Sequence, residues 1–250
     1  MSEYSPAERL RYKLDSRMKK AIRDYALIEE GDSLLIALSG GKDSLSLVAL
    51  LGDLATHFRP SFRVSAVHVQ MKNIPYQTDC AYLEAYCARH KVPFWVRETS
   101  FDPETDHRKS PCFLCSWNRR KTLFETAGEL GCNKLVFGHH RDDFLETLLL
   151  NMLFQGSIQA MAPMLQMDRF PMRIIRPLCL ISEEDLAAFA VQEAFQPQQK
   201  RCPYEKSSFR PSVREMLEKF EAEHPGAKDS LWASMSHIYP QYLPPRDINR

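Results

Sequence analysis

The chain has 250 residues, 44% hydrophobic and 26% charged, which is typical of a globular protein and excludes a disordered or fibrous one. Its net charge of +1 shows no general excess of positive charge, although basic residues cluster locally. Residues 1–20 are densely charged and lack the apolar core of a secretory signal, and no apolar run approaches a membrane span, so we expect a cytoplasmic protein without a membrane partner.

Helices and strands are predicted to alternate along most of the chain. Apolar residues at helical spacing indicate an amphipathic helix over residues 6–29. A short buried strand is expected at 33–38, followed by a glycine loop and an apolar helix that runs to residue 51. Further strands are predicted at 62–69, 93–97, 134–137 and 173–176. Further helices are predicted at 78–90, 116–130, 142–154 and 183–193, with helical pattern again from about residue 212.

This alternation predicts an α/β fold with a doubly wound parallel sheet, because strands joined by helices of this length form right-handed crossovers. We expect three parts: a basic N-terminal helix (1–30), the main domain (31–200) and a small C-terminal helical appendage (201–250). Ligands of such sheets bind at the carboxyl ends of the strands. The loops that follow Leu38 and Phe137 should therefore carry the site.

A glycine loop follows the first predicted strand, with the sequence Ser39, Gly40, Gly41, Lys42, Asp43, Ser44. Adjacent glycines allow a tight turn, and the following helix N-terminus directs amide donors at an anion. It is not a Walker A loop, which needs an earlier glycine and a Ser or Thr after the lysine. An ordinary glycine turn before a helix is the alternative.

The same six residues resemble the signature of the PP-loop ATP pyrophosphatases, whose fold is of the adenine nucleotide alpha-hydrolase type. The resemblance implies that ATP is cleaved between its α and β phosphates and that residues 39–44 bind pyrophosphate. It places Asp43 close to Mg²⁺, as a metal ligand, and Lys42 near the leaving group.

A second polar segment follows the strand predicted at 134–137, and its residues are Gly138, His139, His140, Arg141, Asp142 and Asp143. Taken alone, it is equally well explained by acidic residues at a helix N-terminus. It also resembles the second motif of the PP-loop family. That resemblance implies that Gly138 and His139 bind the nucleotide and that Asp142 and Asp143 act at the reaction centre.

Seven cysteines, an odd number, disfavour a disulfide framework and leave thiols for metal binding. Cys112 and Cys115 form a Cys-x-x-Cys pair before a predicted helix, and Cys202 is the best candidate for a third ligand. A zinc site completed by His107 is the alternative. The remaining cysteines are expected only to pack, namely Cys80, Cys87, Cys132 and Cys179.

The order of PP-loop, Cys-x-x-Cys, second motif and distant cysteine resembles the tRNA 2-thiocytidine synthetase (TtcA) family over residues 17–243. In that family three cysteines hold a [4Fe-4S] cluster whose fourth iron is left for a sulfide. The implied activity is ATP-dependent tRNA thiolation, an AMP- and pyrophosphate-forming sulfur transfer. ATP adenylates the 2-oxo group of a cytosine in the anticodon loop, and sulfide displaces AMP.

The implied partners are tRNA and a sulfur donor, either a cysteine desulfurase or sulfide, and a homodimer is left open. The basic helix of residues 9–23 is expected to bind tRNA phosphates, although a solvated charged face is the alternative. A second basic cluster surrounds Cys202. The alternative functions are a PP-loop ligase or sulfurtransferase for another base or a small molecule, and a non-catalytic regulator that binds ATP, metal and RNA.

Overall fold

The computed structural model describes residues 4–74, 78–102, 110–167, 170–196 and 209–243. Contacts divide the chain into two compact units. The first comprises Met1–Arg141 and Ala162–Ser207, and the second comprises Asp142–Met161 and Ser208–Arg250. Among the described residues, none of the helices combines the length and the apolar character that a bilayer crossing requires.

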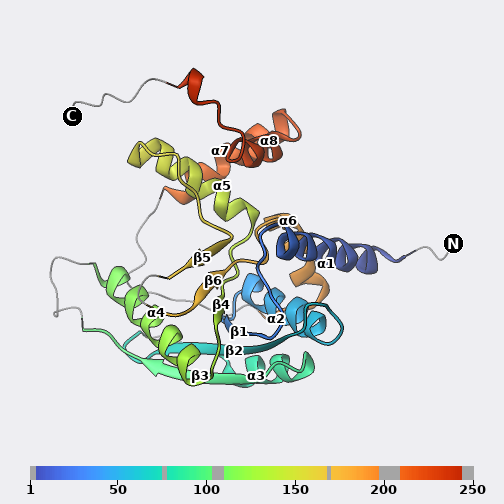
Figure 1. The fold of residues 1–250 in the computed structure, drawn as a ribbon, viewed down its shortest axis with the longest axis vertical. Helices are drawn as coiled ribbons and strands as arrows, with labels where there is room; N and C mark the ends of the chain where they lie inside the picture. Colours follow the sequence, from blue (N-terminus) through green and yellow to red (C-terminus); the bar gives the residue numbers. More distant parts are fainter. Residues whose placement is uncertain (1–3, 75–77, 103–109, 168–169, 197–208, 244–250) are drawn as a thin grey trace. The chain divides into compact units, whose positions relative to one another are not determined.

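The first unit is built on a six-stranded sheet with the order β3-β2-β1-β4-β6-β5 (Figure 1). The strands are β1 (Asp32–Ala37), β2 (Phe62–Met71), β3 (Phe94–Thr99), β4 (Lys134–Val136), β5 (Met164–Gln166) and β6 (Arg173–Ile175). All neighbours pair in parallel except β5, which runs antiparallel to β6. The predicted α/β fold with a doubly wound, mostly parallel sheet is confirmed. The antiparallel edge strand β5 was not predicted, because a strand of three residues is too short to give a periodic pattern.

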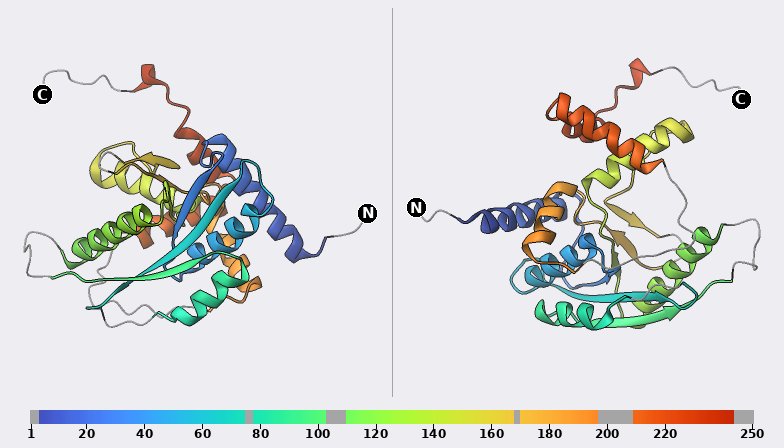
Figure 2. Two further views of the ribbon diagram at one scale, coloured as in Figure 1. Left: turned by 60° about the horizontal axis from the view of Figure 1, so that its bottom comes forward. Right: turned by 180° about the vertical axis from the view of Figure 1, so that it is seen from behind.

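Helices cover both faces of this sheet, as parallel strands require. They are α1 (Pro6–Asp24), α2 (Lys42–Ala55), α3 (Cys80–Arg89), α4 (Pro111–Glu129) and α6 (Glu183–Gln192). The first helix ends at Asp24, five residues before the predicted end, and Ala26 then adopts a left-handed φ of 49°. One face is covered by α4, and the other by α2 with α3 beside it (Figures 1 and 2).

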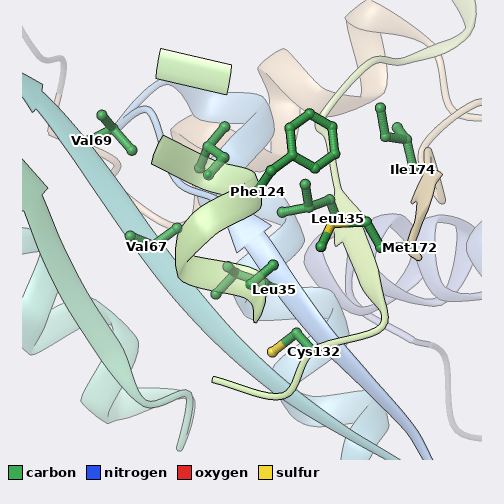
Figure 3. Close-up of a cluster of buried hydrophobic side chains, with 10 residues drawn as sticks. Leu35, Val67, Val69, Phe124, Cys132, Leu135, Met172 and Ile174 are labelled. Carbon is green, nitrogen blue, oxygen red and sulfur yellow. The ribbon is translucent and has the colours of Figure 1, made fainter. Parts of the chain in front are cut away.

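The hydrophobic core beneath α4 is formed by side chains from neighbouring strands of the sheet. Leu35 of β1 and Val67 of β2 point from neighbouring strands toward Phe124 of α4, together with Leu135 of β4 (Figure 3). Phe124 also stacks on Phe170, with 4.5 Å between ring centroids. Because alternate strand residues point to opposite faces, the next residues of β1 pack against the other helical layer. The strand is therefore buried along most of its length, as predicted for residues 33–38.

The second unit is helical. Its elements are α5 (Arg141–Leu150), a π-helical turn (Asn151–Gln155), α7 (Arg210–Glu223), α8 (Ala227–Ser234) and a 3-10 turn (Pro240–Tyr242). Arg141, the first residue of α5, belongs to the first unit. Leu145 of α5 packs with Val213 and Leu217 of α7. Beside them the fully buried carboxylate of Glu146 accepts hydrogen bonds from Arg210 (3.2 Å) and Arg214 (2.7 Å). The predicted helical character after about residue 212 is thus confirmed.

Candidate functional site

The glycine loop predicted to bind phosphate lies between β1 and α2 and is shaped by its two serines. Gly40 has a φ of +79°, which a residue with a side chain rarely adopts, so glycine is required here. The Ser44 hydroxyl donates to the carbonyl oxygen of Gly41 (2.9 Å) and accepts from the backbone amide of Ser39 (3.2 Å). The hydroxyl of Ser39 accepts from the amide of Gly41 (3.3 Å). The loop therefore holds its shape through its own hydrogen bonds.

The N-terminus of α2 is open to an anion. Gly41 is its N-cap residue, and in the described part of the chain no side chain caps this helix end. The first amides of a helix have no partner within the helix, and together with the helix dipole they attract negative charge. The other long helices of the first unit are capped by side chains, those of Ser5, Asp79, Ser110 and Ser182. This end of α2 fits a phosphate.

Lys42 adds a positive charge at the same end and is held between two carboxylates. Its ammonium donates to Asp43 Oδ1 and to Glu183 Oε2, each at 2.9 Å. Burial alone would lower the pKa of Lys42, but the hydrogen bonds and charges of Asp43 and Glu183 outweigh it and raise that pKa. Lys42 is therefore a fixed cation beside the phosphate site.

Glu183 belongs to the first turn of α6 and ties Lys42 to the second motif. The same Oε2 atom that accepts from Lys42 lies 2.7 Å from Nε2 of the buried His140. The hydrogen bond from His140, followed by that from Lys42, overcomes burial and lowers the pKa of Glu183 to about 2. Glu183 is thus ionised at neutral pH, and His140 carries its proton on Nε2.

Asp43, His140 and Glu183 present one possible metal ligand each, and these atoms lie within 4.8 Å of one another. Carboxylate oxygens are the ligands Mg²⁺ prefers, so Asp43 and Glu183 fit that ion, whereas His140 fits a role in orienting Glu183. Asp43 was predicted from the sequence as a site residue, whereas Glu183 and His140 were not. Ser182 caps α6 by accepting from the amide of Asp185, so an acidic residue at position 183 is explained by its place in the first turn of a helix. For this reason the sequence did not single out Glu183.

Gly138 brings the second motif against the glycine loop. A Cβ added to Gly138 would lie 3.2 Å from the carbonyl carbon of Asp43, from its Cβ, and from the amide nitrogen of Ser44. Two of these three atoms belong to the backbone, so a side chain here would force the glycine loop to shift by a few tenths of an ångström. Next to it, His139 Nδ1 accepts a hydrogen bond from Arg176 Nε at 3.3 Å. Arg176 directly follows β6 and was not named from the sequence.

Asp142 and Asp143 lie in the first turn of α5, as predicted, within the second unit. The buried Asp142 accepts a hydrogen bond from Lys228 Nζ at 2.6 Å. Asp143 accepts one from Arg210 at 3.4 Å. Both acids thus connect α5 to the C-terminal helices, and their catalytic role stays a prediction.

Cys112 and Cys115 lie in the first two turns of α4, which begins at Pro111, five residues earlier than predicted. Ser110 caps the helix by accepting from the amide of Phe113, and Pro111 starts it. Residues three apart share a helix face, so the two thiols can reach a common metal. Cys112 is exposed, and Cys115 packs at the edge of the Met71, Ile74 and Phe101 cluster.

The third predicted ligand, Cys202, and the alternative ligand His107 lie outside the described residues. The other cysteines are placed for packing: Cys87, Cys132 and Cys179 are buried and Cys80 is partly buried. Burial raises the pKa of Cys87 and of Cys179 to about 12, so both stay protonated thiols. On α4, by contrast, Cys112 is exposed and Cys115 is partly buried.

Three basic residues of helix α1 form ion pairs with acidic residues of the same protein. Arg11 pairs with Asp53 at 2.6 Å, Lys13 pairs with Asp185 at 2.8 Å, and Lys20 pairs with Asp24. Arg9, Arg17 and Arg23 are exposed and Lys19 is half-buried, all on the same helix. These four residues are the basic side chains of α1 best placed to contact phosphates.

Comparison with known proteins agrees with this geometry. The PP-loop domain family matches residues 10–220. A protein of Dechloromonas aromatica (strain RCB), named tRNA-cytidine(32) 2-sulfurtransferase, is 34% identical over 99% of this chain and 88% of its own length. A protein of the same name from Sorangium cellulosum (strain So ce56) is 38% identical over 94% of this chain and 84% of its own length.

A solved structure shares the fold. The U34-tRNA thiolase NcsA from Methanococcus maripaludis, determined with its [4Fe-4S] cluster, is 24% identical, covers 93% of this chain and 81% of its own, and superposes with a TM-score of 0.74. The sequence relatives cover nearly the whole chain at more than 30% identity. The chain therefore belongs to the PP-loop family and, within it, to the tRNA 2-thiocytidine synthetases.

Proposed function

We propose that the protein is an ATP-dependent tRNA sulfurtransferase that replaces the 2-oxo group of cytidine 32 in the anticodon loop with sulfur. The observation that carries this proposal is the meeting of a PP-loop with the second motif at Gly138, in a chain that also presents a cysteine pair at the start of α4. Helix α4 follows β3 and precedes the parallel strand β4, so it begins at the carboxyl edge of the sheet. The PP-loop lies at that edge as well.

The first half-reaction is an adenylation. The 2-oxo oxygen of cytidine attacks the α-phosphorus of ATP, the bond from that phosphorus to the bridging oxygen breaks, and pyrophosphate leaves with the bonding electrons. The open N-terminus of α2 and the ammonium of Lys42 face the negative charge that grows on pyrophosphate. Glu183 fixes Lys42 in this position. Asp43 and Glu183 would hold Mg²⁺, and the bound ion would neutralise further phosphate charge.

The second half-reaction transfers sulfur. A sulfide sulfur attacks C2 of the adenylated base, and AMP leaves with the former 2-oxo oxygen. Sulfur enters in the fully reduced state, so no electron donor is needed in this step. Cys112 and Cys115 have the spacing, exposure and helix position of cluster ligands, with Cys202 proposed as the third. A [4Fe-4S] cluster bound by these cysteines supplies the place where sulfur is held for transfer.

Transfer RNA is the substrate under this proposal, and sulfide supplies the sulfur; persulfide sulfur from a cysteine desulfurase enters the same step after a two-electron reductant has converted it to sulfide. The exposed basic residues of α1 are proposed to contact tRNA phosphates. A second copy of the chain and a cytoplasmic location stay predictions from the sequence.

The proposal is tested in cells by mass spectrometry of tRNA nucleosides from a strain that lacks the gene. We expect 2-thiocytidine to be absent, to return with the wild-type gene, and to stay absent with Asp43→Ala. Persistence of 2-thiocytidine in the deletion strain, or loss of a different thionucleoside, contradicts the assignment of the substrate.

A further inference from the structure

The first three turns of α4 expose an unusual set of side chains next to the cysteine pair. The exposed residues there are Cys112, Phe113, Trp117, Arg120 and Lys121. Trp117 is 53% exposed and Phe113 is 48% exposed. The two aromatic residues are four apart, so they lie one turn from each other on the same side of the helix. Large aromatic surfaces left together in water mark a binding surface more often than a structural role.

Basic side chains continue this surface. Lys121 follows Trp117 by one further turn, and its ammonium lies 5.8 Å from the centroid of the indole ring. Glu125 shares that charge through an ion pair of 3.8 Å. A cation–π contact at an exposed site is weak, so it orders the ring without competing strongly with a stacked planar group. An aromatic face flanked by positive charge fits single-stranded nucleic acid, whose bases stack while its phosphates seek cations.

Arg120 connects the same surface to the nucleotide side of the sheet edge. Burial lowers the pKa of Arg176, and the nearby positive charge of Arg120 lowers it further. Arg176 in turn donates to His139 of the second motif. A phosphate bound near these two guanidinium groups would relieve the repulsion between them. The topology agrees, because α4 and the PP-loop both begin at the carboxyl edge of the sheet.

We propose that Trp117, with Phe113 beside it, is a stacking surface for an unpaired base of the RNA substrate next to Cys112. This inference rests on the proposed function and deepens it, because it names a positioning residue for the base or its loop neighbour. The indole contributes to RNA binding through a flat ring and not through charge. Its loss should therefore weaken binding of unpaired RNA and leave binding of paired RNA unchanged.

The test uses the full-length, iron-loaded protein and two RNA probes at one fixed salt concentration. One probe is a hairpin with the anticodon-loop sequence, and the other is a blunt duplex of the same stem. Dissociation constants are measured by fluorescence anisotropy for the wild type, Trp117→Ala, Trp117→Phe and Trp117→Leu. Phe220→Ala is the matched control, since Phe220 is 51% exposed and lies on α7 in the second unit.

We expect Trp117→Ala to weaken hairpin binding by about 5- to 150-fold, the range for removing one base–aromatic stack. Duplex binding and iron content should not change. Trp117→Phe should retain most of the affinity, and Trp117→Leu should lose it although it keeps an apolar side chain. If Trp117→Ala fails to fold, the difference between Phe and Leu decides the question. The KM for hairpin RNA should rise in Trp117→Ala while kcat at saturating RNA is retained.

Equal hairpin binding by the wild type and Trp117→Leu overturns the inference, and so does an equal loss of hairpin and duplex binding. A defect that occurs only when a protein supplies the sulfur, and not with sulfide, assigns the surface to a protein partner and also overturns it. The two proposals fail separately. If the wild type neither binds nor thiolates the hairpin, the proposed function is wrong, whereas wild-type affinity and wild-type KM for the hairpin in all Trp117 variants refute only the stacking surface.

Discussion

Substituting Gly138 by alanine tests the contact between the two motifs. The new Cβ would lie 3.2 Å from three atoms of Asp43 and Ser44, which is closer than ordinary van der Waals contact. The glycine loop must therefore move by a few tenths of an ångström. A misplacement of about 1 Å lowers turnover by about 100-fold, so we expect kcat for AMP formation to fall by about 10- to 100-fold. Overpacking of this kind costs about 1–3 kcal/mol of stability.

Two other glycines separate this effect from a general loss of stability. A Cβ at Gly52 would lie 2.6 Å from the carbonyl oxygen of His90, so Gly52→Ala should destabilise the fold strongly, yet at a place away from the loop. Gly128 of α4 has nothing within 4 Å, and its replacement by alanine should be neutral or stabilising by up to about 1 kcal/mol. AMP formation and denaturant unfolding are measured for all three variants. Normal kcat in folded Gly138→Ala would refute the proposed contact.

Three further predictions concern charge and cysteine chemistry. Glu183→Gln should lower AMP formation. It should also reduce the free energy of unfolding at neutral pH by about 1–2 kcal/mol. The pKa of about 2 for Glu183, against the usual 4.5, corresponds to about 3.4 kcal/mol, and screening by solvent reduces this value. Because a lowered carboxyl pKa stabilises the fold above pH 4.5, this difference in unfolding free energy should shrink as pH falls from about 5 to 2; a difference independent of pH contradicts the ion pair. Cys112→Ser should lose iron and thiolation while retaining ATP binding, and Cys87→Ser should keep its iron by metal analysis. Arg17→Glu with Lys19→Glu should weaken tRNA binding and flatten its dependence on salt, and equal salt slopes for variant and wild type would remove α1 from the interface.

The PP-loop could be predicted because its determinants are contiguous in sequence. An apolar strand, two adjacent glycines and an apolar helix fix the geometry of the loop locally. The approach of Gly138 to this loop follows from the topology, since parallel strands end at one edge of the sheet. The start of α4 at Pro111 also had a local signal, because serine followed by proline is typical of a helix N-terminus. The Cys-x-x-Cys pattern was instead interpreted as part of a loop before the helix.

Glu183 could not be predicted, because its partners are distant in the chain. It meets Lys42 across 141 residues of separation, and its local pattern is that of a helix cap. The same holds for Lys134, a fully buried lysine within a strand that is neutralised by Asp32 at 2.6 Å. A charged residue inside a predicted strand can be buried only if the fold brings an opposite charge to it, and the sequence does not show which residue that is.

The most direct test of the proposed function is the stoichiometry of the reaction in a purified system. Iron-loaded protein is incubated without oxygen with unmodified tRNA, ATP, Mg²⁺ and sulfide, and the AMP, pyrophosphate and 2-thiocytidine formed are quantified together. The proposed function predicts one AMP and one pyrophosphate for each 2-thiocytidine, with the sulfur at position 32 alone. Formation of ADP and phosphate, or AMP release without any thiolated cytidine, would contradict it.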